Sequence, residues 1–205
     1  MKKINDIEND LWPRLWVTFM PEPTSLNMMG LVGRGLLWLG LVAYSISLLG
    51  GIHPDKGQWL HLINLPFHEA GHIVFGFANP LITSIGGTLM QLLIPLTCAG
   101  VLLLRQQDGF GAAVALWWFG ENFIDIAPYI KDASVGELPL LGGNVGKEAP
   151  YGFHDWEFIL TETGLIEHDA KLALFSYLLG CGIMLVALIW AALQLWYYLK
   201  LYQEQ

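Results

Sequence analysis

The sequence predicts an all-α protein, a multi-pass transmembrane helical bundle with about five membrane segments, one of them partial or kinked. Of the 205 residues, 54% are hydrophobic and only 14% are charged, whereas soluble domains carry about 25% charged residues. The mean hydropathy is +0.48, and the apolar residues gather in runs of about 20, the length that crosses a bilayer core as a helix. A soluble globule is therefore excluded, as are a disordered chain and a disulfide-rich scaffold.

The expected segments follow one another along the chain. Residues 11–20 (LWPRLWVTFM) combine two tryptophans with a proline and an arginine, which suits a short segment lying in the membrane interface. The first membrane span is interrupted only by Arg34, whose long side chain can reach the interface. The expected membrane segments cover residues 31–52, 59–78, 81–104, 110–130 and 172–199.

These segments divide the chain into four parts. We expect an N-terminal cytoplasmic or interfacial segment at 1–30, a membrane core with a metal site at 31–130, a polar loop at 131–169, and a C-terminal transmembrane helix and tail at 170–205. The polar loop is rich in glycine, proline and acidic residues, and we regard it as a candidate lid. No cleaved signal peptide is expected, because no uninterrupted apolar core follows the first residues.

The basic residues predict the orientation, and the overall charge limits the partners. Counted on alternate sides of five spans, one side carries Lys2, Lys3, Arg14, Arg34, Lys131, Lys147 and Lys171, and the other carries Lys56, Arg105 and Lys200. Because cytoplasmic loops carry the excess of lysine and arginine, we expect a plasma-membrane protein with a cytoplasmic N-terminus. The net charge of −8 leaves no basic surface for nucleic acid, so the lipid bilayer is the expected partner. Nothing in the sequence indicates an oligomeric state.

The two cysteines do not point to a special chemistry. Cys98 and Cys181 both lie in apolar runs. In such surroundings a free cysteine usually acts as a small buried hydrophobic side chain. We therefore assign neither cysteine to the functional site.

The second segment contains a metal-binding motif, His-Glu-Ala-Gly-His at residues 68–72. Because residues four apart lie on one face of a helix, His68 and His72 can bind the same metal ion. Glu69 lies beside them, where it can take a proton from water activated by the metal. A charged residue at membrane depth costs about 2.5 to 3.5 kcal/mol, so packing gives no reason to place these groups there. The pattern predicts a zinc site.

The flanking residues predict how far this helix extends. Pro66 suits the first turn of a helix, and Asn79 precedes Pro80, which disfavours the helical conformation at Asn79. A helix over 66–79 measures about 21 Å, shorter than the bilayer core of about 30 Å. A short helix at membrane depth must be buried in protein or face a water-filled cavity, and hydrolysis needs that water.

A catalytic zinc ion normally has three protein ligands and one open position, so a third ligand is needed. Glu121 and Asp125 are four residues apart in the fourth segment and share one helix face. One would bind the metal while the other accepts a hydrogen bond from a metal-bound histidine. The residues leave both assignments open.

Further polar residues are candidates for the surroundings of the metal. A glycine pair, Gly86-Gly87, lies in the third segment, where it either admits backbone or substrate close to the metal or lets two helices pack closely. The polar loop would contribute a ligand or a hydrogen bond if it folds over the site. The accessory candidates are Gln91, Asn122, His154 and Asp155.

The HEAGH motif on an apolar segment, followed two segments later by an acidic residue in NFID, resembles the site-2 protease family of intramembrane zinc metalloproteases. The resemblance implies that His68 and His72 bind zinc and that Glu69 is the general base. It also implies that Asp125 is the third ligand and that the substrate is a membrane protein or peptide. The match is short, and the usual Leu-Asp-Gly of that family is missing.

Three alternatives remain open beside this interpretation. The spacing of Glu121 and Asp125 equally resembles the thermolysin type, in which the glutamate is the ligand and the aspartate orients a histidine. The absent Leu-Asp-Gly favours a non-catalytic metal-binding membrane subunit or sensor that uses the same residues. A lipid or small-molecule hydrolase is a third hypothesis, because a ligand motif does not encode the substrate.

Overall fold

The computed structural model describes residues 11–23, 27–49, 59–141 and 143–205. Within them the regular structure is helical, apart from one bridge between Pro139 and Val145, which confirms the all-α prediction. The elements are α1 (Leu11–Phe19), α2 (Met28–Leu48), α3 (His61–Phe75), α4 (Pro80–Leu104), α5 (Gly109–Lys131), η3 (Gly146–Glu148), α6 (Asp155–Glu162), η4 (Ile166–His168) and α7 (Asp169–Gln203). Parts of the predicted 1–30 segment (1–10 and 24–26) and the end of the first predicted span (50–52) lie outside the described residues.

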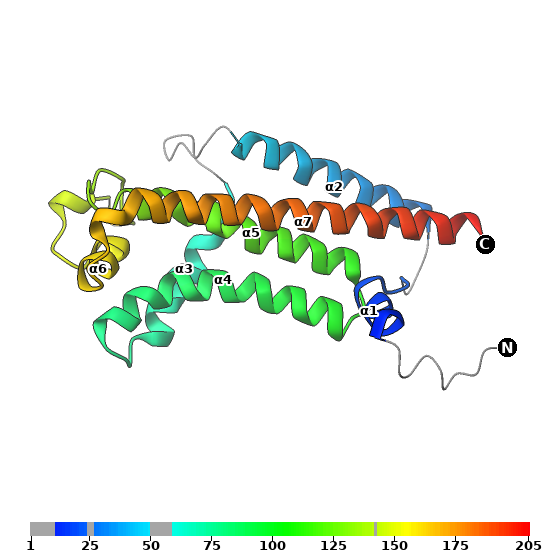
Figure 1. Cartoon of the computed structure of the whole chain (residues 1–205), viewed down its shortest axis with the longest axis horizontal. Helices are drawn as coiled ribbons and strands as arrows, with labels where there is room; N and C mark the ends of the chain where they lie inside the picture. The colour runs from blue at the N-terminus through cyan, green and yellow to red at the C-terminus, as the bar shows by residue number, and fades with distance from the viewer. Residues whose placement is uncertain (1–10, 24–26, 50–58, 142) are drawn as a thin grey trace.

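The long helices form a bundle along one axis. Helix α7 runs the length of the molecule, with α2 on one side of it and α5 and α4 on the other (Figure 1). Helix α5 packs along α7 and also against α4, and α4 packs against α3. Side-chain caps begin three of these helices: an oxygen of Asn27, Asn79 or Asp108 accepts a hydrogen bond from the backbone N–H three residues further on, which satisfies a donor that the helix leaves unpaired.

Three segments among the described residues are long and apolar enough to cross a membrane: α2, α4, and η4 with α7. Helix α3 has 15 residues and measures about 22 Å, and α5 carries carboxylates in its middle. The start of α2 and the end of α7 lie at the same end of the bundle (Figure 1), whereas five alternating spans would place them at opposite ends. The prediction of a membrane protein is supported, and its count of five spans is not confirmed.

The predicted boundaries of the motif helix were wrong at both ends. Helix α3 begins at His61, so that Pro66 lies inside it. Proline lacks the N–H that would bond to the residue four positions earlier, but packing of α3 along α4 outweighs this local preference. At the other end, α3 stops at Phe75. Asn79 does not extend α3 but caps the start of α4.

Apolar side chains face outward and polar side chains face inward. Leu36 in α2 and Leu185 in α7 are 64% and 59% exposed, whereas Asn64, Gln91 and Glu121 are buried. A protein in water shows the opposite distribution of large apolar and charged side chains. A hydrocarbon surrounding accounts for both observations, so the distribution supports a membrane location.

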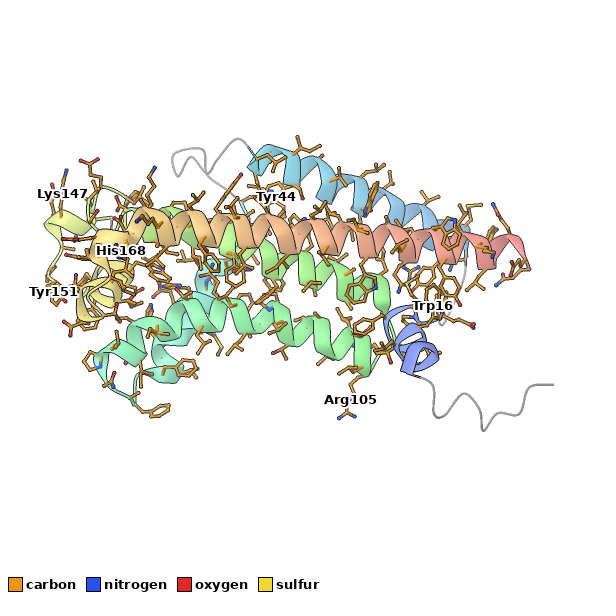
Figure 2. All side chains as sticks on the ribbon, viewed as in Figure 1. Trp16, Tyr44, Arg105, Lys147, Tyr151 and His168 are labelled. Carbon is orange, nitrogen blue, oxygen red and sulfur yellow. The ribbon has the colours of Figure 1, made fainter. Side chains whose placement is uncertain are left out.

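The two ends of the bundle carry different structures. Lys147, Tyr151 and His168 lie at one end, whereas Trp16 and Arg105 lie at the other (Figure 2). The predicted polar loop at 131–169 folds at the first end into η3, α6 and η4. Its core residue Leu160 is buried in a cluster with residues of α5 and α7. The segment is therefore a packed cap on the bundle.

Glycines set the closest helix crossings. A Cβ atom at Gly180 in α7 would lie 2.6 Å from the carbonyl oxygen of Gly120 in α5. In the same way, a Cβ at Gly71 in α3 would overlap the carbonyl oxygen of Gly86 in α4. Small residues allow such close backbone contact. The second crossing presses the motif helix against α4.

A methyl group at the α5–α7 crossing should destabilise the fold. We expect Gly180→Ala to lower the thermal midpoint of the chain in detergent, since forcing a methyl into a packed contact costs about 1–3 kcal/mol. The matched control is Gly182→Ala, because a Cβ at Gly182 has no neighbour within 4 Å. Equal midpoints for the two variants would contradict the crossing.

Candidate metal centre

The two histidines of the motif point at one carboxylate. Their ring centroids lie 4.9 Å apart. The Nε2 atom of His68 lies 3.0 Å from Oδ2 of Asp155, and the Nε2 atom of His72 lies 3.2 Å from the same oxygen. Within the part of the chain that the structure describes, these three residues are the group whose ligand atoms lie close enough together to hold a metal ion.

Hydrogen bonds on the far side of each ring determine which nitrogen is free to bind. His72 Nδ1 lies 2.9 Å from the backbone oxygen of Thr83, and a carbonyl oxygen only accepts, so Nδ1 carries the hydrogen. His68 Nδ1 lies 3.1 Å from the amide oxygen of Gln91 and donates in the same way. Both rings therefore turn Nε2 toward Asp155.

The resulting arrangement fits a metal ion. Two ring nitrogens and a carboxylate oxygen this close together need a proton or a metal cation between them. Tetrahedral ligands of zinc at about 2.0–2.1 Å lie about 3.3 Å from one another, close to the 3.0 and 3.2 Å separations of the nitrogen and oxygen atoms. Imidazole nitrogen and carboxylate oxygen are both zinc ligands.

The carboxyl group of Asp155 is in the form that a ligand requires. Burial raises its pKa, but hydrogen bonds with His68 and His72 outweigh this effect and hold the pKa below its usual value. An ionised carboxylate is the form that binds a metal. The same histidines that would share the metal therefore favour the binding form of Asp155.

Helix α6 holds Asp155 in place. His154 precedes the helix and caps it, since its Nδ1 accepts a hydrogen bond from the backbone N–H of Glu157 at 3.2 Å. Its Nε2 lies 3.5 Å from Oδ2 of Asp132, and the ring is 2% exposed. The capping contact occupies Nδ1 of His154, and Nε2 faces Asp132. His154 therefore affects the metal group only by positioning its neighbour Asp155.

A cavity of about 860 Å³ opens onto the metal group. Glu69, the residue after His68, lines the same cavity. Its volume lies in the range of about 300–1,000 Å³ that holds small ligands. The apolar part of the wall comes from α3, α5 and the cap and includes Leu62, Leu65, Ile126, Phe153 and Trp156. The cavity therefore offers a mainly apolar chamber with its ionisable groups gathered on α3, α5 and α6.

The carboxylates of α5 lie outside the metal group, although Asp125 lines the same cavity. Asp125 accepts hydrogen bonds from Asn64 Nδ2 at 3.0 Å and from Gln91 Nε2 at 2.9 Å, and its Oδ1 lies 3.0 Å from His61 Nδ1. Glu121 is fully buried and accepts a hydrogen bond from the same Asn64 amide at 3.0 Å. Both acids therefore face Asn64, one turn before His68 in α3.

The structure differs from the sequence prediction in the third ligand. Neither Glu121 nor Asp125 joins the metal group, since Asn64 holds both one turn away from the histidines. Asp155, predicted only as an accessory residue, takes that place. Asn122 is also outside the group, because its side chain donates to the backbone of its own helix.

Sequence reasoning missed residues that surround the ligands. Asn64 precedes His68 by four residues, so the same helical spacing that singled out the motif also placed Asn64 on its face. His61 carried no such signal, because its role depends on contact with α5. Gly87 was predicted to allow either a close approach or helix packing, and its position fits both: a Cβ there would lie 2.7 Å from Nε2 of both His68 and His72, and its Cα lies 2.9 Å from where a Cβ of Gly71 would stand.

No family model, curated protein or solved structure matches this chain. Function is therefore inferred from the geometry of the site.

A methyl group at position 87 should block the metal site. We expect Gly87→Ala to weaken zinc binding by at least about tenfold, the lower end of the range for changes around metal ligands, because the methyl occupies the space between the two Nε2 atoms. Gly100→Ala in the same helix is the control, since a Cβ there meets nothing within 4 Å. The affinities are measured by competition with a chromophoric chelator, and unchanged binding by Gly87→Ala would contradict the assignment.

Substitution of Asp155 and of Glu121 tests whether the third ligand comes from α6 or from α5. Asp155→Ala should weaken zinc binding by more than the roughly 10–100-fold typical of groups that only surround a ligand. Glu121→Gln should bind zinc close to the wild-type affinity, because Glu121 lies outside the group. Metal content after dialysis checks both variants. If Glu121→Gln weakened zinc binding more than Asp155→Ala, the third ligand would belong to α5.

Proposed function

We propose that the chain is an intramembrane zinc metalloprotease that hydrolyses peptide bonds of membrane-protein substrates. One observation carries the proposal: His68, His72 and Asp155 converge on one point, and Glu69 lines the same cavity. The outward-facing apolar side chains and the resemblance of HEAGH to the site-2 protease motif support the membrane setting and the reaction.

Each residue has a role in this proposal. His68, His72 and Asp155 hold the metal. When bound, zinc polarises the scissile carbonyl and makes water a stronger acid. Glu69 takes a proton from the attacking water as the water oxygen bonds to the carbonyl carbon. Glu69 then delivers this proton to the amine that leaves when the C–N bond breaks. The apolar cavity wall would receive the unwound substrate segment.

The ligand count favours an enzyme over the alternative of a non-catalytic subunit or sensor. Structural zinc sites are normally closed by four protein ligands, whereas catalytic sites keep one position open. The group formed by the described residues has three members and adjoins a cavity. An open position beside a general base is the arrangement that hydrolysis requires.

We also propose how the chain lies in the membrane. Helix α3 is the partial segment, and α2, α4, α5 and α7 cross, so that α1 and the C-terminus share one side. The helix ends on that side carry Arg14 in α1, Arg34 in α2, Arg105 after α4 and Lys200 in α7, and those on the side of α6 carry Lys131, Lys147 and Lys171. This excess of four basic residues over three favours a cytoplasmic N-terminus, and we place the chain in the plasma membrane. The metal group then lies near the opposite interface, where water reaches it.

Loss of the general base should abolish cleavage and spare metal binding. In liposomes that contain a fluorogenic transmembrane peptide, we expect Glu69→Ala to slow cleavage by about 10²–10⁴-fold while it retains bound zinc. Cleavage that is unaffected by this change would contradict the proposal. Hydrolysis of vesicle lipid without peptide cleavage would replace the protease with a lipid hydrolase.

A further inference from the structure

Asp125 is a buried acid that the metal group does not use as a ligand. It is 5% exposed, and the groups that contact its oxygens are nitrogen donors: His61 Nδ1, Asn64 Nδ2 and Gln91 Nε2 at 2.9–3.2 Å. An ionised carboxylate only accepts hydrogen bonds. These donors therefore match a charged Asp125 held in one orientation.

The orientation of Asp125 is anchored in turn by a tryptophan. An indole N–H only donates, and Trp118 donates to Oδ1 of Asn64 at 2.8 Å. The amide of Asn64 must then present its NH₂ end to the other side, where it meets Asp125 and Glu121 at 3.0 Å each. The indole of α5 thus determines which end of Asn64 faces the acids.

Asp125 determines the orientation of Gln91 in the same manner. A glutamine amide has one accepting and one donating end, and its contacts decide which way it points. Because Asp125 binds the NH₂ end at 2.9 Å, the oxygen end faces Nδ1 of His68 at 3.1 Å. Gln91 is itself 4% exposed, so bulk water has little access to these contacts.

We propose that Asp125 and Gln91 form a positioning relay that keeps His68 in the tautomer that binds metal through Nε2. The oxygen of Gln91 requires hydrogen on Nδ1 of His68, which leaves Nε2, 3.0 Å from Oδ2 of Asp155, as the nitrogen that can bind the metal. His72 needs no such relay, because a backbone carbonyl fixes its ring. The inference rests on the metal assignment of the proposed function. It gives Asp125 a positioning role, which Asp125 exerts through Gln91.

Two substitutions test the relay in the full chain in detergent micelles. Asp125→Asn keeps the shape but no longer requires the NH₂ end of Gln91, and Gln91→Leu removes both contacts. The control is Thr88→Val, a buried residue of the same helix whose hydroxyl has no hydrogen-bond partner among the described residues. Zinc affinity comes from chelator competition, and the histidine tautomer comes from ¹⁵N NMR of the zinc-free protein.

We expect both variants to weaken zinc binding by about 10–100-fold and the control to retain the wild-type affinity. In the wild type the His68 ring should carry its hydrogen on Nδ1, and this signal should be lost in the variants. Equal zinc affinity in wild type and variants would overturn the relay and leave the metal site standing. Equal loss in Thr88→Val would also overturn it, since the effect would then come from α4 packing. A wild-type chain that binds no zinc would overturn the metal site and the relay together.

Discussion

The structure depends on one constraint: polar groups buried in an apolar bundle find no bulk water, so each must find its partner within the protein. An unpaired charge in such surroundings is strongly unfavourable. Helices α3, α4, α5 and α6 meet where their polar residues gather, and Asn64 and Gln91 use both ends of their amides there. In the same region Nε2 of His68 and of His72 meets the carboxylate of Asp155, and in the proposed site a metal ion binds all three.

Close backbone contact between helices makes this arrangement possible. Gly71 and Gly86 touch where α3 crosses α4, and Gly87 leaves open the space between the two histidine rings. The cap over residues 132–168 completes the site, since α6 packs against α4 and α5 and brings Asp155 to the histidines. The metal group therefore joins α3 to α6, and the cavity opens between them.

Most of the long helices and the two histidines of the metal group could be predicted from the sequence. The apolar runs predicted the long helices, because about 20 apolar residues in succession favour a helix that crosses a bilayer. The HEAGH spacing placed His68 and His72 on one helix face. The third ligand could not be predicted, because Asp155 reaches the site through the packing of the cap, which no local pattern encodes. Pro66 misled the start of α3 for a related reason, since contact with α4 overrode a local preference. The sequence predicted a functional role for Asp125 because a buried acid is unfavourable, but only the structure shows its contact with Gln91.

In the proposed site, two imidazoles and one carboxylate hold a zinc ion with one position open. X-ray absorption at the zinc edge, recorded on the full chain in detergent, measures this directly. We expect one zinc ion per chain with two nitrogen ligands from histidine and oxygen ligands from Asp155 and an exchangeable solvent molecule. A chain without zinc, or a zinc ion closed by four protein ligands, would contradict it.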